Sequence, residues 1–264
     1  MTIKEKFGSL ALVTGASAGI GKAFARALAA EGIDLILVAR RMDDLERLKT
    51  ELESAWGVSV QPVAADLSKE DFLSIIQTSI GNRVPDILIN NAGYGTSGYF
   101  HEIDGDTETA MIKVNCIAPV ALTRHFLPNM LKQNKGALIF LSSIAANQPS
   151  PLGITYSATK VFDLFLGEGL HKELEGTGVA VLTVQPGATS TEFQKVADYN
   201  AIKGSRSAED VVQTALRALG RKRTVVDGLN NRFMTLLARI LPRSVAISAA
   251  QQWTNRYRKH GEKD

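Results

Sequence analysis

The sequence predicts an α/β fold in which one doubly wound parallel sheet is covered by helices on both faces. Short apolar runs alternate with helical segments of roughly ten residues or more, and this alternation indicates right-handed crossovers between parallel strands. A glycine-rich turn joins the first run to the first helix, and small or polar residues follow the later runs. A chain of 264 residues, 45% of them apolar, is long enough for a single domain with a large core.

Seven apolar runs are predicted to be the strands of this sheet. They combine leucine with β-branched residues and lack polar alternation, which is typical of strands that are buried on both faces. In chain order we expect them at 10–13, 34–39, 58–64, 86–89, 137–141, 179–184 and 224–226.

The helices are predicted from apolar residues that recur at helical spacing. The charged segment 43–56, for example, places Leu45, Leu48 and Leu52 on one face. In chain order we expect helices from 21 to about 31 and at 43–56, 66–80, 106–132, 154–174 and 207–219.

The composition argues against several classes of protein. The formal net charge of +3 is too small to indicate nucleic-acid binding, and no run reaches the ~18 apolar residues of a membrane span. The single cysteine, Cys116, excludes an intramolecular disulfide framework and fits a reducing compartment. His101, His125, His171 and His260 lack the spacing of metal ligands, so we expect no metal. These observations favour a cytoplasmic protein.

The turn after the first strand has the features of a phosphate site. Gly15, Gly19 and Gly21 follow Thr14 with the spacing G-x-x-x-G-x-G. Glycine permits positive φ and close approach of a ligand, and the helix behind the turn presents free N–H groups to an anion. For this segment alone, a plain tight turn is the alternative.

Small and polar residues also follow the other strands. In doubly wound sheets, ligands bind beyond the carboxyl ends of the strands near the switch in strand order, so we expect these residues to share one site. Asp66 has a second interpretation as a helix N-cap. The residues are Arg40, Arg41, Asp66, Leu67, Asn90, Asn91, Ala92, Gly93, Ser142, Ser143, Pro186 and Gly187.

Tyr156 and Lys160 are the pair that can perform acid–base chemistry. Residues four apart share a helix face, so the two side chains are predicted to be neighbours. A phenol normally titrates near pH ~10, and a nearby ammonium stabilises the phenolate and brings the pKa toward a working value. The alternative is a partly buried tyrosine beside a lysine that extends its ammonium to solvent.

Two further polar residues are candidates for the same site. Ser143 directly follows a strand and can donate a hydrogen bond to a substrate oxygen, although it can equally cap a turn. Asn115 lies in an apolar helical run, where a buried amide needs partners. Those partners are either other groups of a functional site or the neighbouring backbone.

These motifs, in this order and spacing, resemble those of the short-chain dehydrogenase/reductase family. The resemblance runs from about 10 to 191 and implies a Rossmann-like, nicotinamide-dependent oxidoreductase. It implies that Tyr156 is the general acid–base, that Ser143 positions the substrate oxygen and that Lys160 holds the nicotinamide ribose and assists Tyr156. Asn115 would support a water in a proton relay.

The resemblance also implies a cofactor site. Asp66 and Leu67 would contact adenine, and Asn90 and Gly93 would line the site. Thr189 departs from the family, which usually has an apolar residue there. The predicted catalytic residues are Asn115, Ser143, Tyr156 and Lys160, and the predicted cofactor-binding residues are Gly15, Ser17, Gly19, Ile20, Gly21, Arg40, Asp66, Leu67, Asn90, Ala92, Gly93, Tyr156, Lys160, Pro186, Gly187, Thr189 and Thr191.

The residues after the second strand favour NADP(H) over NAD(H). An acidic residue there would bind the ribose 2′-hydroxyl of NAD, whereas a basic residue accommodates a 2′-phosphate. The sequence has Ala39, Arg40 and Arg41 and no carboxylate. Arg40 can form a fork of hydrogen bonds to a phosphate. Two solvated arginines at the start of a helix are the alternative.

The last part of the chain is predicted to extend the domain. We expect a catalytic domain at 1–227, with a substrate lid at about 188–206, and a basic amphipathic extension at 228–264. Apolar and basic residues alternate in the extension, which indicates contact with an anionic membrane surface, a cover over the substrate or a second subunit. The resemblance implies a homodimer or homotetramer through the helices at 106–132 and 154–174.

The function expected from these observations is carbonyl reduction or alcohol oxidation with NADP(H). The substrate would be an apolar ketone, aldehyde or secondary alcohol, and neither a metal nor a nucleic acid is expected to take part. A catalytically silent NADP(H)-binding sensor or scaffold is the alternative. The loss of Tyr156 or Lys160 would have favoured that second function, and both residues are present.

Overall fold

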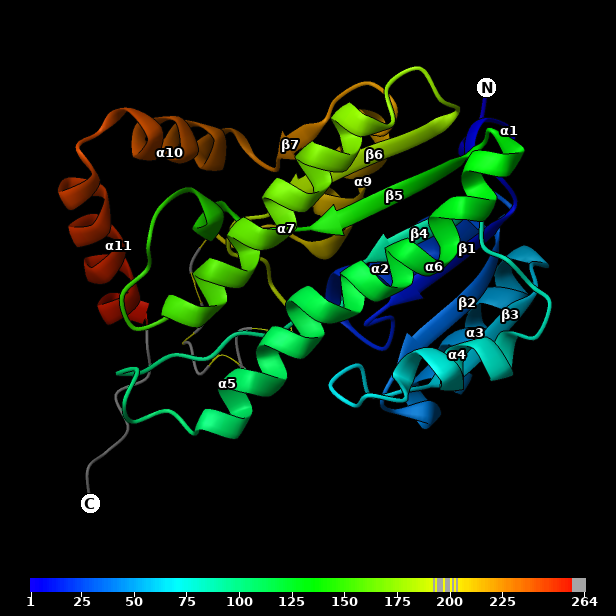
Figure 1. Ribbon diagram of the computed structural model, residues 1–264, viewed down its shortest axis with the longest axis horizontal. Coiled ribbons are helices and arrows are strands. Elements are labelled where there is room, and N and C mark those ends of the chain that lie inside the picture. Colours follow the sequence, from blue (N-terminus) through cyan, green and yellow to red (C-terminus); the bar gives the residue numbers. More distant parts are fainter. Residues whose placement is uncertain (192, 194–196, 198–199, 201, 203, 258–264) are drawn as a thin grey trace.

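The computed structural model describes residues 1–191, 193, 197, 200, 202 and 204–257. Within these residues, a seven-stranded sheet has the order β3-β2-β1-β4-β5-β6-β7, and all neighbours are parallel (Figure 1). The predicted doubly wound sheet is therefore confirmed. The strands are β1 (Leu10–Thr14), β2 (Asp34–Ala39), β3 (Val60–Ala64), β4 (Ile87–Asn90), β5 (Gly136–Leu141), β6 (Val179–Gln185) and β7 (Thr224–Val226).

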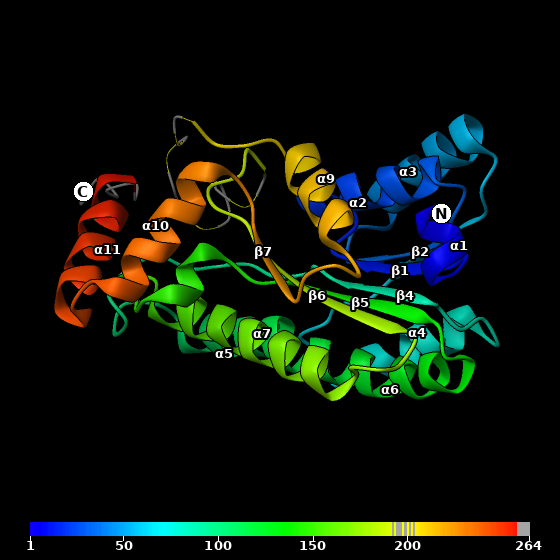
Figure 2. The ribbon, with the colours of Figure 1, turned by 90° about the horizontal axis from the view of Figure 1, so that it is seen from above.

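Helices cover both faces of the sheet (Figure 2). One face carries α2 (Gly19–Ala30), α3 (Met42–Trp56) and α9 (Ala208–Ala218), and the other carries α4 (Phe72–Ile80), α5 (Gly105–Ile112), α6 (Ala118–Gln133) and α7 (Ile154–Glu173). Among the described residues, the other α-helices are the short α1 (Ile3–Phe7), α10 (Leu229–Ile240) and α11 (Arg243–Tyr257). α10 and α11 lie together at one end of the molecule.

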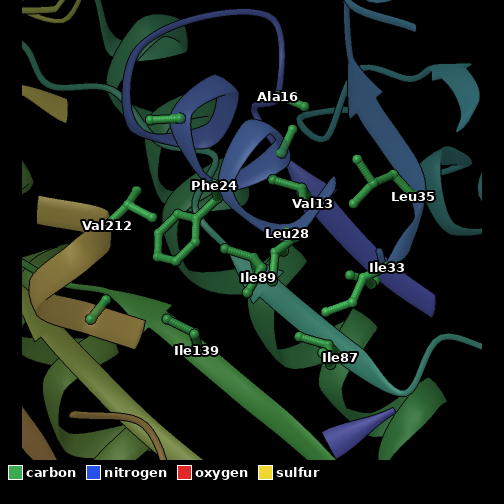
Figure 3. Close-up of a cluster of buried hydrophobic side chains, with 14 of the residues drawn as sticks. Val13, Ala16, Phe24, Leu28, Ile33, Leu35, Ile87, Ile89, Ile139 and Val212 are labelled. Carbon is green, nitrogen blue, oxygen red and sulfur yellow. The ribbon is translucent and has the colours of Figure 1, made fainter. Parts of the chain in front are cut away.

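The core consists of two apolar layers separated by the sheet. Because side chains alternate along a strand, Val13 packs into the layer beneath α2 while Leu12 packs into the opposite layer. Phe24 and Leu28 of α2 fill the first layer and are fully buried (Figure 3). Phe126 of α6 fills the second layer. This double burial explains why the strands appear in the sequence as continuous apolar runs.

The structure differs from the predicted helices at three places. The helix predicted from 66 begins at Phe72, because the Asp66 carboxylate accepts hydrogen bonds from the amide and hydroxyl of Ser68 and holds a turn there. The helix predicted over 106–132 is interrupted by the π-helical segment η1 (Lys113–Ile117). The short helix α1, closed by a capping box between Thr2 and Glu5, was not predicted.

The strand order places the switch point between β1 and β4. The chain continues from β1 to β2 on one side, whereas β4 lies on the other side of β1 and leads to β5. Loops that leave the carboxyl ends of β1 and β4 therefore diverge to opposite faces, and ligands of doubly wound sheets bind at such a switch point. The predicted site residues lie at the carboxyl ends of the strands.

Candidate active site

The glycine-rich turn is built to bring a ligand close to the backbone. Gly15 and Gly19 have φ of +66° and +53°, and a Cβ on Gly21 would lie 2.3 Å from the carbonyl oxygen of Gly15. α2 begins at Gly19, and no side chain in the described part of the chain caps its N-terminus at Ala18. The first N–H groups of this 12-residue helix are therefore free to bind an anion.

Thr14 and Asn91 connect this turn to β4. The Thr14 hydroxyl accepts hydrogen bonds from the amides of Asn91 and Ala92, both at 3.0 Å, and donates to the carbonyl of Ile89. The Asn91 side-chain amide donates to the Thr14 carbonyl at 2.8 Å. These bonds fix the turn relative to the carboxyl end of β4.

Arg40, Asp66 and Tyr94 gather beyond the ends of β2, β3 and β4. Burial acts to raise the pKa of Asp66, but hydrogen bonds from Ser68 and the charge of Arg40 hold it below the ordinary value of an aspartate. Burial raises the pKa of Tyr94, and the charge of Arg40 opposes this shift. Arg40 is exposed and therefore faces solvent beside the turn. Its neighbour Arg41 instead forms an ion pair with Asp44 at 2.6 Å and contacts the Ser17 hydroxyl at 3.5 Å.

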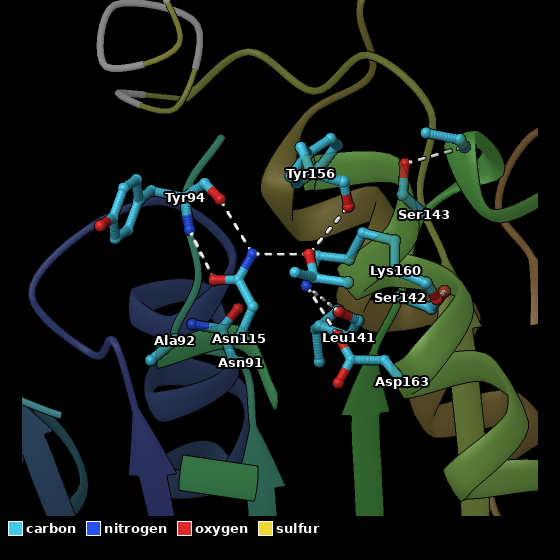
Figure 4. A network of polar contacts seen from close by, with 12 residues as sticks. Asn91, Ala92, Tyr94, Asn115, Leu141, Ser142, Ser143, Tyr156, Lys160 and Asp163 are labelled. Atoms are coloured by element: carbon cyan, nitrogen blue, oxygen red, sulfur yellow. Dashed lines mark hydrogen bonds and ion pairs between the residues drawn. The ribbon is translucent and has the colours of Figure 1, made fainter. Parts of the chain in front are cut away.

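A fully buried amide, Asn115, links the loop after β4 to α7 (Figure 4). Its Nδ2 donates to the Tyr94 carbonyl and to the Thr159 hydroxyl, each at 2.9 Å, and its Oδ1 accepts from the Tyr94 amide. The Thr159 hydroxyl in turn donates to the Tyr156 carbonyl at 2.8 Å. Asn115 lies in η1, and π-helical turns of this kind are frequent at functional sites.

Tyr156 lies in the first turn of α7 with Ser143 and Phe193 beside it. Burial raises the pKa of the Tyr156 phenol, while the charge of Lys160 and a hydrogen bond with Ser143 lower it. Ser143 also caps the short 3-10 helix η2 (Ile144–Asn147) by accepting the amide of Ala145 at 3.1 Å. The rings of Tyr156 and Phe193 have centroids 5.3 Å apart, so the phenol has an apolar cover on one side.

Lys160 is buried one turn after Tyr156. Its Nζ lies 6.0 Å from the centroid of the Tyr156 ring. The ammonium donates to the Leu141 carbonyl at 2.7 Å and to Asp163 Oδ2 at 2.9 Å. Burial acts to lower the pKa of Lys160, but the charge of Asp163 raises it above the ordinary value of a lysine. The side chain is therefore charged despite its burial.

The segment after β6 returns to the glycine-rich turn. A Cβ on Gly19 would lie 3.1 Å from Thr191 Cβ, so Thr191 is in contact with the start of α2. Thr189 is buried and forms an isolated parallel bridge with Arg206. The predicted lid at 188–206 includes 192, 194–196, 198–199, 201 and 203, which lie outside the described residues, as does His260.

Other predicted residues also lie near the carboxyl ends of the strands, and each has its own contacts. A Cβ on Gly93 would lie 3.3 Å from Lys160 Nζ, so Gly93 is close to the ammonium. The side-chain Nδ2 of Asn90 donates to the hydroxyl of Thr123 on α6 at 3.2 Å, and Leu67 is buried. The carbonyl of Pro186 accepts the amide of Ile144 at 3.0 Å. Pro186 therefore fixes the turn that carries Ser143.

Two residues with clear contacts in the site, Thr159 and Asp163, were not among the predicted site residues. Asn91 was expected at the site, but its hydrogen bond to the Thr14 carbonyl was not predicted. Thr159 and Asp163 contact Asn115 and Lys160, respectively. Their positions relative to Tyr156 were visible in the sequence, but their partners come from other elements or depend on the rotamer of a buried side chain.

Neither a metal centre nor a membrane span accompanies this site in the described residues. They contain no group of three or more His, Cys, Asp or Glu side chains that could hold a metal ion. Among the same residues, no helix is long and apolar enough to cross a bilayer.

Comparisons with known proteins agree with this arrangement. The family model described as short chain dehydrogenase matches residues 9–201. A very-long-chain 3-oxoacyl-CoA reductase of Mus musculus is 30% identical over 270 residues, which cover 99% of this chain and 86% of the mouse protein.

Two solved structures are similar over nearly the whole chain. One, from work on the stereoselectivity of 7β-hydroxysteroid dehydrogenase, has a TM-score of 0.87 and 26% identity, and covers 95% of this chain and 99% of its own. A short-chain dehydrogenase from Sphingobium yanoikuyae in complex with NADPH has a TM-score of 0.78 and 29% identity, and covers 97% and 98%, respectively.

Proposed function

Because the chain belongs to the short-chain dehydrogenase family and is an oxidoreductase, we propose that it interconverts apolar carbonyl compounds and their alcohols with NADP(H). The observation that carries the proposal is the placement of Tyr156, with Ser143 beside its hydroxyl and Lys160 one turn along α7. The substrate would be a ketone, an aldehyde or a secondary alcohol. The ring of Phe193 against Tyr156 supports apolar substituents.

The residues around the first turn fit a dinucleotide. The free N-terminus of α2 suits a pyrophosphate, and a side chain at Gly21 would collide with the backbone of Gly15. The exposed Arg40 suits the 2′-phosphate of NADP(H), and the end of β2 offers no carboxylate to bind a ribose 2′-hydroxyl. NAD(H) would bind the same turn without the contribution of Arg40. When bound, the nicotinamide supplies or accepts the hydride.

The protein's own groups would move the proton and hold the substrate. In reduction, the Tyr156 hydroxyl donates its proton to the substrate oxygen, and in oxidation the phenolate accepts it. Ser143 donates a hydrogen bond that orients the same oxygen. The charge of Lys160 stabilises the phenolate, and its ammonium has a donor for the ribose. Asn115 would support a water that carries protons to this group.

The decisive experiment follows NADPH absorbance in the presence of a panel of aldehydes, hydroxysteroid ketones, 3-oxoacyl thioesters and quinones. We expect turnover with at least one apolar carbonyl compound and a loss of about 10²–10⁴-fold in kcat for Tyr156→Phe with NADPH binding retained. Near-normal turnover by Tyr156→Phe would contradict the role of Tyr156. Tight NADPH binding without turnover of any panel member would favour the sensor or scaffold function.

We also propose that two or four copies associate through α6 and α7. The support is a set of large apolar side chains on these helices and η1 that are exposed in a single chain. Phe165 is 68% exposed, and Ile117 is 55% exposed. Burial of such residues is the main favourable term in subunit association.

A further proposal concerns the C-terminal extension. Leu229, Phe233, Leu236 and Ile240 recur at helical spacing on α10 and are each more than half exposed, whereas the polar Thr235 is buried. The sequence from 228 to 257 contains arginines and no acidic residue. An exposed apolar stripe with basic flanks suits an anionic membrane surface, and the free Cys116 suits the reducing cytoplasm.

Vesicle flotation tests the membrane proposal. We expect binding to vesicles that contain phosphatidylserine, weak binding to pure phosphatidylcholine, and loss of binding in Phe233→Ser/Ile240→Ser. Concentration-dependent association that the same double variant abolishes, without vesicle binding, would identify a second copy as the partner of α10.

A further inference from the structure

A buried carboxylate, Asp163, lies within the proposed catalytic group of α7. Its Oδ2 is 2.9 Å from Lys160 Nζ, and the two side chains are only 4% and 6% exposed. The residues are three apart on the helix, so their side chains leave the same face, which packs toward β5. Asp163 lies outside the Tyr-x-x-x-Lys motif and has no role in the function proposed above.

The contacts of Lys160 show how Asp163 controls its direction. An ammonium has three protons to donate. One is directed to Asp163, and a second goes to the carbonyl of Leu141 at the end of β5. Both acceptors hold Nζ toward the helix–sheet contact, which leaves one proton for Tyr156 or for a ribose.

Few titratable or polar side chains of the described residues face Lys160 and Asp163. Tyr156 and Lys160 come from α7 itself, Cys116 faces the pair from η1, and Ser143 approaches Tyr156 from the turn after β5. Burial raises the pKa of the Cys116 thiol to about 11, so this thiol is neutral at physiological pH. Burial raises the pKa of Asp163, and the charge of Lys160 opposes this shift. Among the described residues, Asp163 is the carboxylate whose charge acts on both Lys160 and Tyr156.

A purely structural role does not account for the pair well. Burying two ions has a desolvation cost that a pair of packed apolar side chains would avoid. Among the described residues, Asp163 has no hydrogen-bond or ion-pair partner other than Lys160. The carboxylate therefore acts through the ammonium rather than by joining α7 to another element.

We propose that Asp163 is a positioning residue that directs the Lys160 ammonium toward the contact between α7 and β5 and offsets part of the positive charge that reaches Tyr156. The inference rests on the proposed function. A cofactor ribose would then compete with Asp163 for the Lys160 ammonium. The Tyr156 phenol would therefore lose its proton at a higher pH than it would beside Lys160 without the Asp163 carboxylate.

The Asp163→Asn variant tests both parts without relying on turnover. In the protein without cofactor, ultraviolet titration of the phenols, with Tyr156→Phe as the difference reference, reports the ionisation of Tyr156. Removing the negative charge favours the phenolate, so we expect the Tyr156 midpoint to move to lower pH by about one unit. NADPH, measured by its fluorescence on binding, should bind a few-fold more tightly because Lys160 is released.

Two controls distinguish this effect from a general disturbance. Glu168→Gln removes a carboxylate from the same helix that binds Thr224 and Arg223 instead, and it should leave both readouts unchanged. Asp163→Glu keeps the charge and should retain most of the wild-type phenol midpoint. Asp163→Ser provides a second neutral variant if Asp163→Asn does not fold.

An unchanged phenol midpoint and unchanged NADPH affinity in a folded neutral variant would overturn the inference. Failure of both neutral variants to fold would assign Asp163 a purely structural role and would overturn it as well. A shifted midpoint in a protein that turns over no carbonyl compound would instead uphold the coupling of Asp163 to Tyr156 and refute the proposed function.

Discussion

At the scale of single residues, neighbouring arginines after β2 have different surroundings. Arg41 is held by Asp44 and contacts Ser17, whereas Arg40 is exposed beside Asp66 and Tyr94. A cofactor phosphate beyond the end of β2 would therefore meet Arg40 without first breaking an ion pair such as the one that holds Arg41.

We therefore expect Arg40→Ser to weaken NADPH binding by about 1.5–3 kcal/mol, the usual value of hydrogen bonds to a charged group. NADH binding should change little. Isothermal titration with both nucleotides measures the two affinities, and Arg41→Ser is the matched control. A larger loss in Arg41→Ser would place the phosphate at Arg41 instead.

Cys116 gives a prediction with a defined pH dependence. The thiolate is the reactive form, and burial raises the pKa of this thiol to about 11. Iodoacetamide should leave the folded protein unmodified at pH 7, and alkylation should become faster as the pH approaches 11. Mass spectrometry measures the modification, with urea-unfolded protein as the positive control. Rapid alkylation of folded protein at pH 7 would show that the thiol is exposed and ionised.

At the scale of elements, the turn from β1 to α2 depends on the absence of a side chain. In Gly21→Ala, the new Cβ would lie 2.3 Å from the Gly15 carbonyl oxygen and 2.5 Å from the Asn91 amide, so the start of α2 must move. We expect NADPH binding to be lost and the free energy of unfolding to fall by about 1–3 kcal/mol.

Gly169→Ala on α7 is the matched control for this prediction. Apart from the adjacent residues and the backbone of α7 itself, no atom of the described residues lies within 4 Å of its added Cβ, and alanine favours a helix over glycine by about 0.5–1 kcal/mol. This variant should therefore be slightly more stable and should bind NADPH normally. Urea unfolding and nucleotide titration measure both variants. Normal NADPH affinity in Gly21→Ala would mean that the turn is not the phosphate site.

The elements also show which features of the chain are readable from its sequence. The strand β2 was predicted at its observed bounds, because a run buried on both faces has a strong apolar signal. The segment η1 was missed because one widened turn does not change apolar spacing enough to be seen. The start of α4 was wrong because the Asp66 side chain competes with helix formation.

Only part of the candidate site could be predicted from the sequence, because many of its contacts join separate elements. Tyr156 and Lys160 were paired correctly because helix geometry alone makes residues four apart neighbours. The bonds of Asn115 to Tyr94 and Thr159 join the loop after β4, η1 and α7, so they depend on the packing of the whole sheet. No pattern along the sequence reports such contacts.

At the scale of the whole molecule, the exposed apolar side chains of α7 and η1 predict an assembly. Phe165→Asp would place a charge in the proposed subunit contact, where burial without a partner is unfavourable. We expect this variant to sediment as a smaller species than the wild-type protein in analytical ultracentrifugation. Trp56→Asp replaces another exposed apolar side chain, on α3, and should leave the assembly unchanged. An unaltered sedimentation coefficient in Phe165→Asp would exclude this face.

The contact between Thr191 and Gly19 has a consequence for the kinetics of the whole enzyme. The segment that leads to Phe193, the residue that covers Tyr156, begins against the turn proposed to hold the nucleotide phosphates. A nucleotide bound at that turn would therefore contact the segment that borders the carbonyl or alcohol substrate. Steady-state kinetics should accordingly follow a compulsory order, with the dinucleotide first to arrive and last to depart, and product inhibition by NADP⁺ should be competitive with NADPH alone.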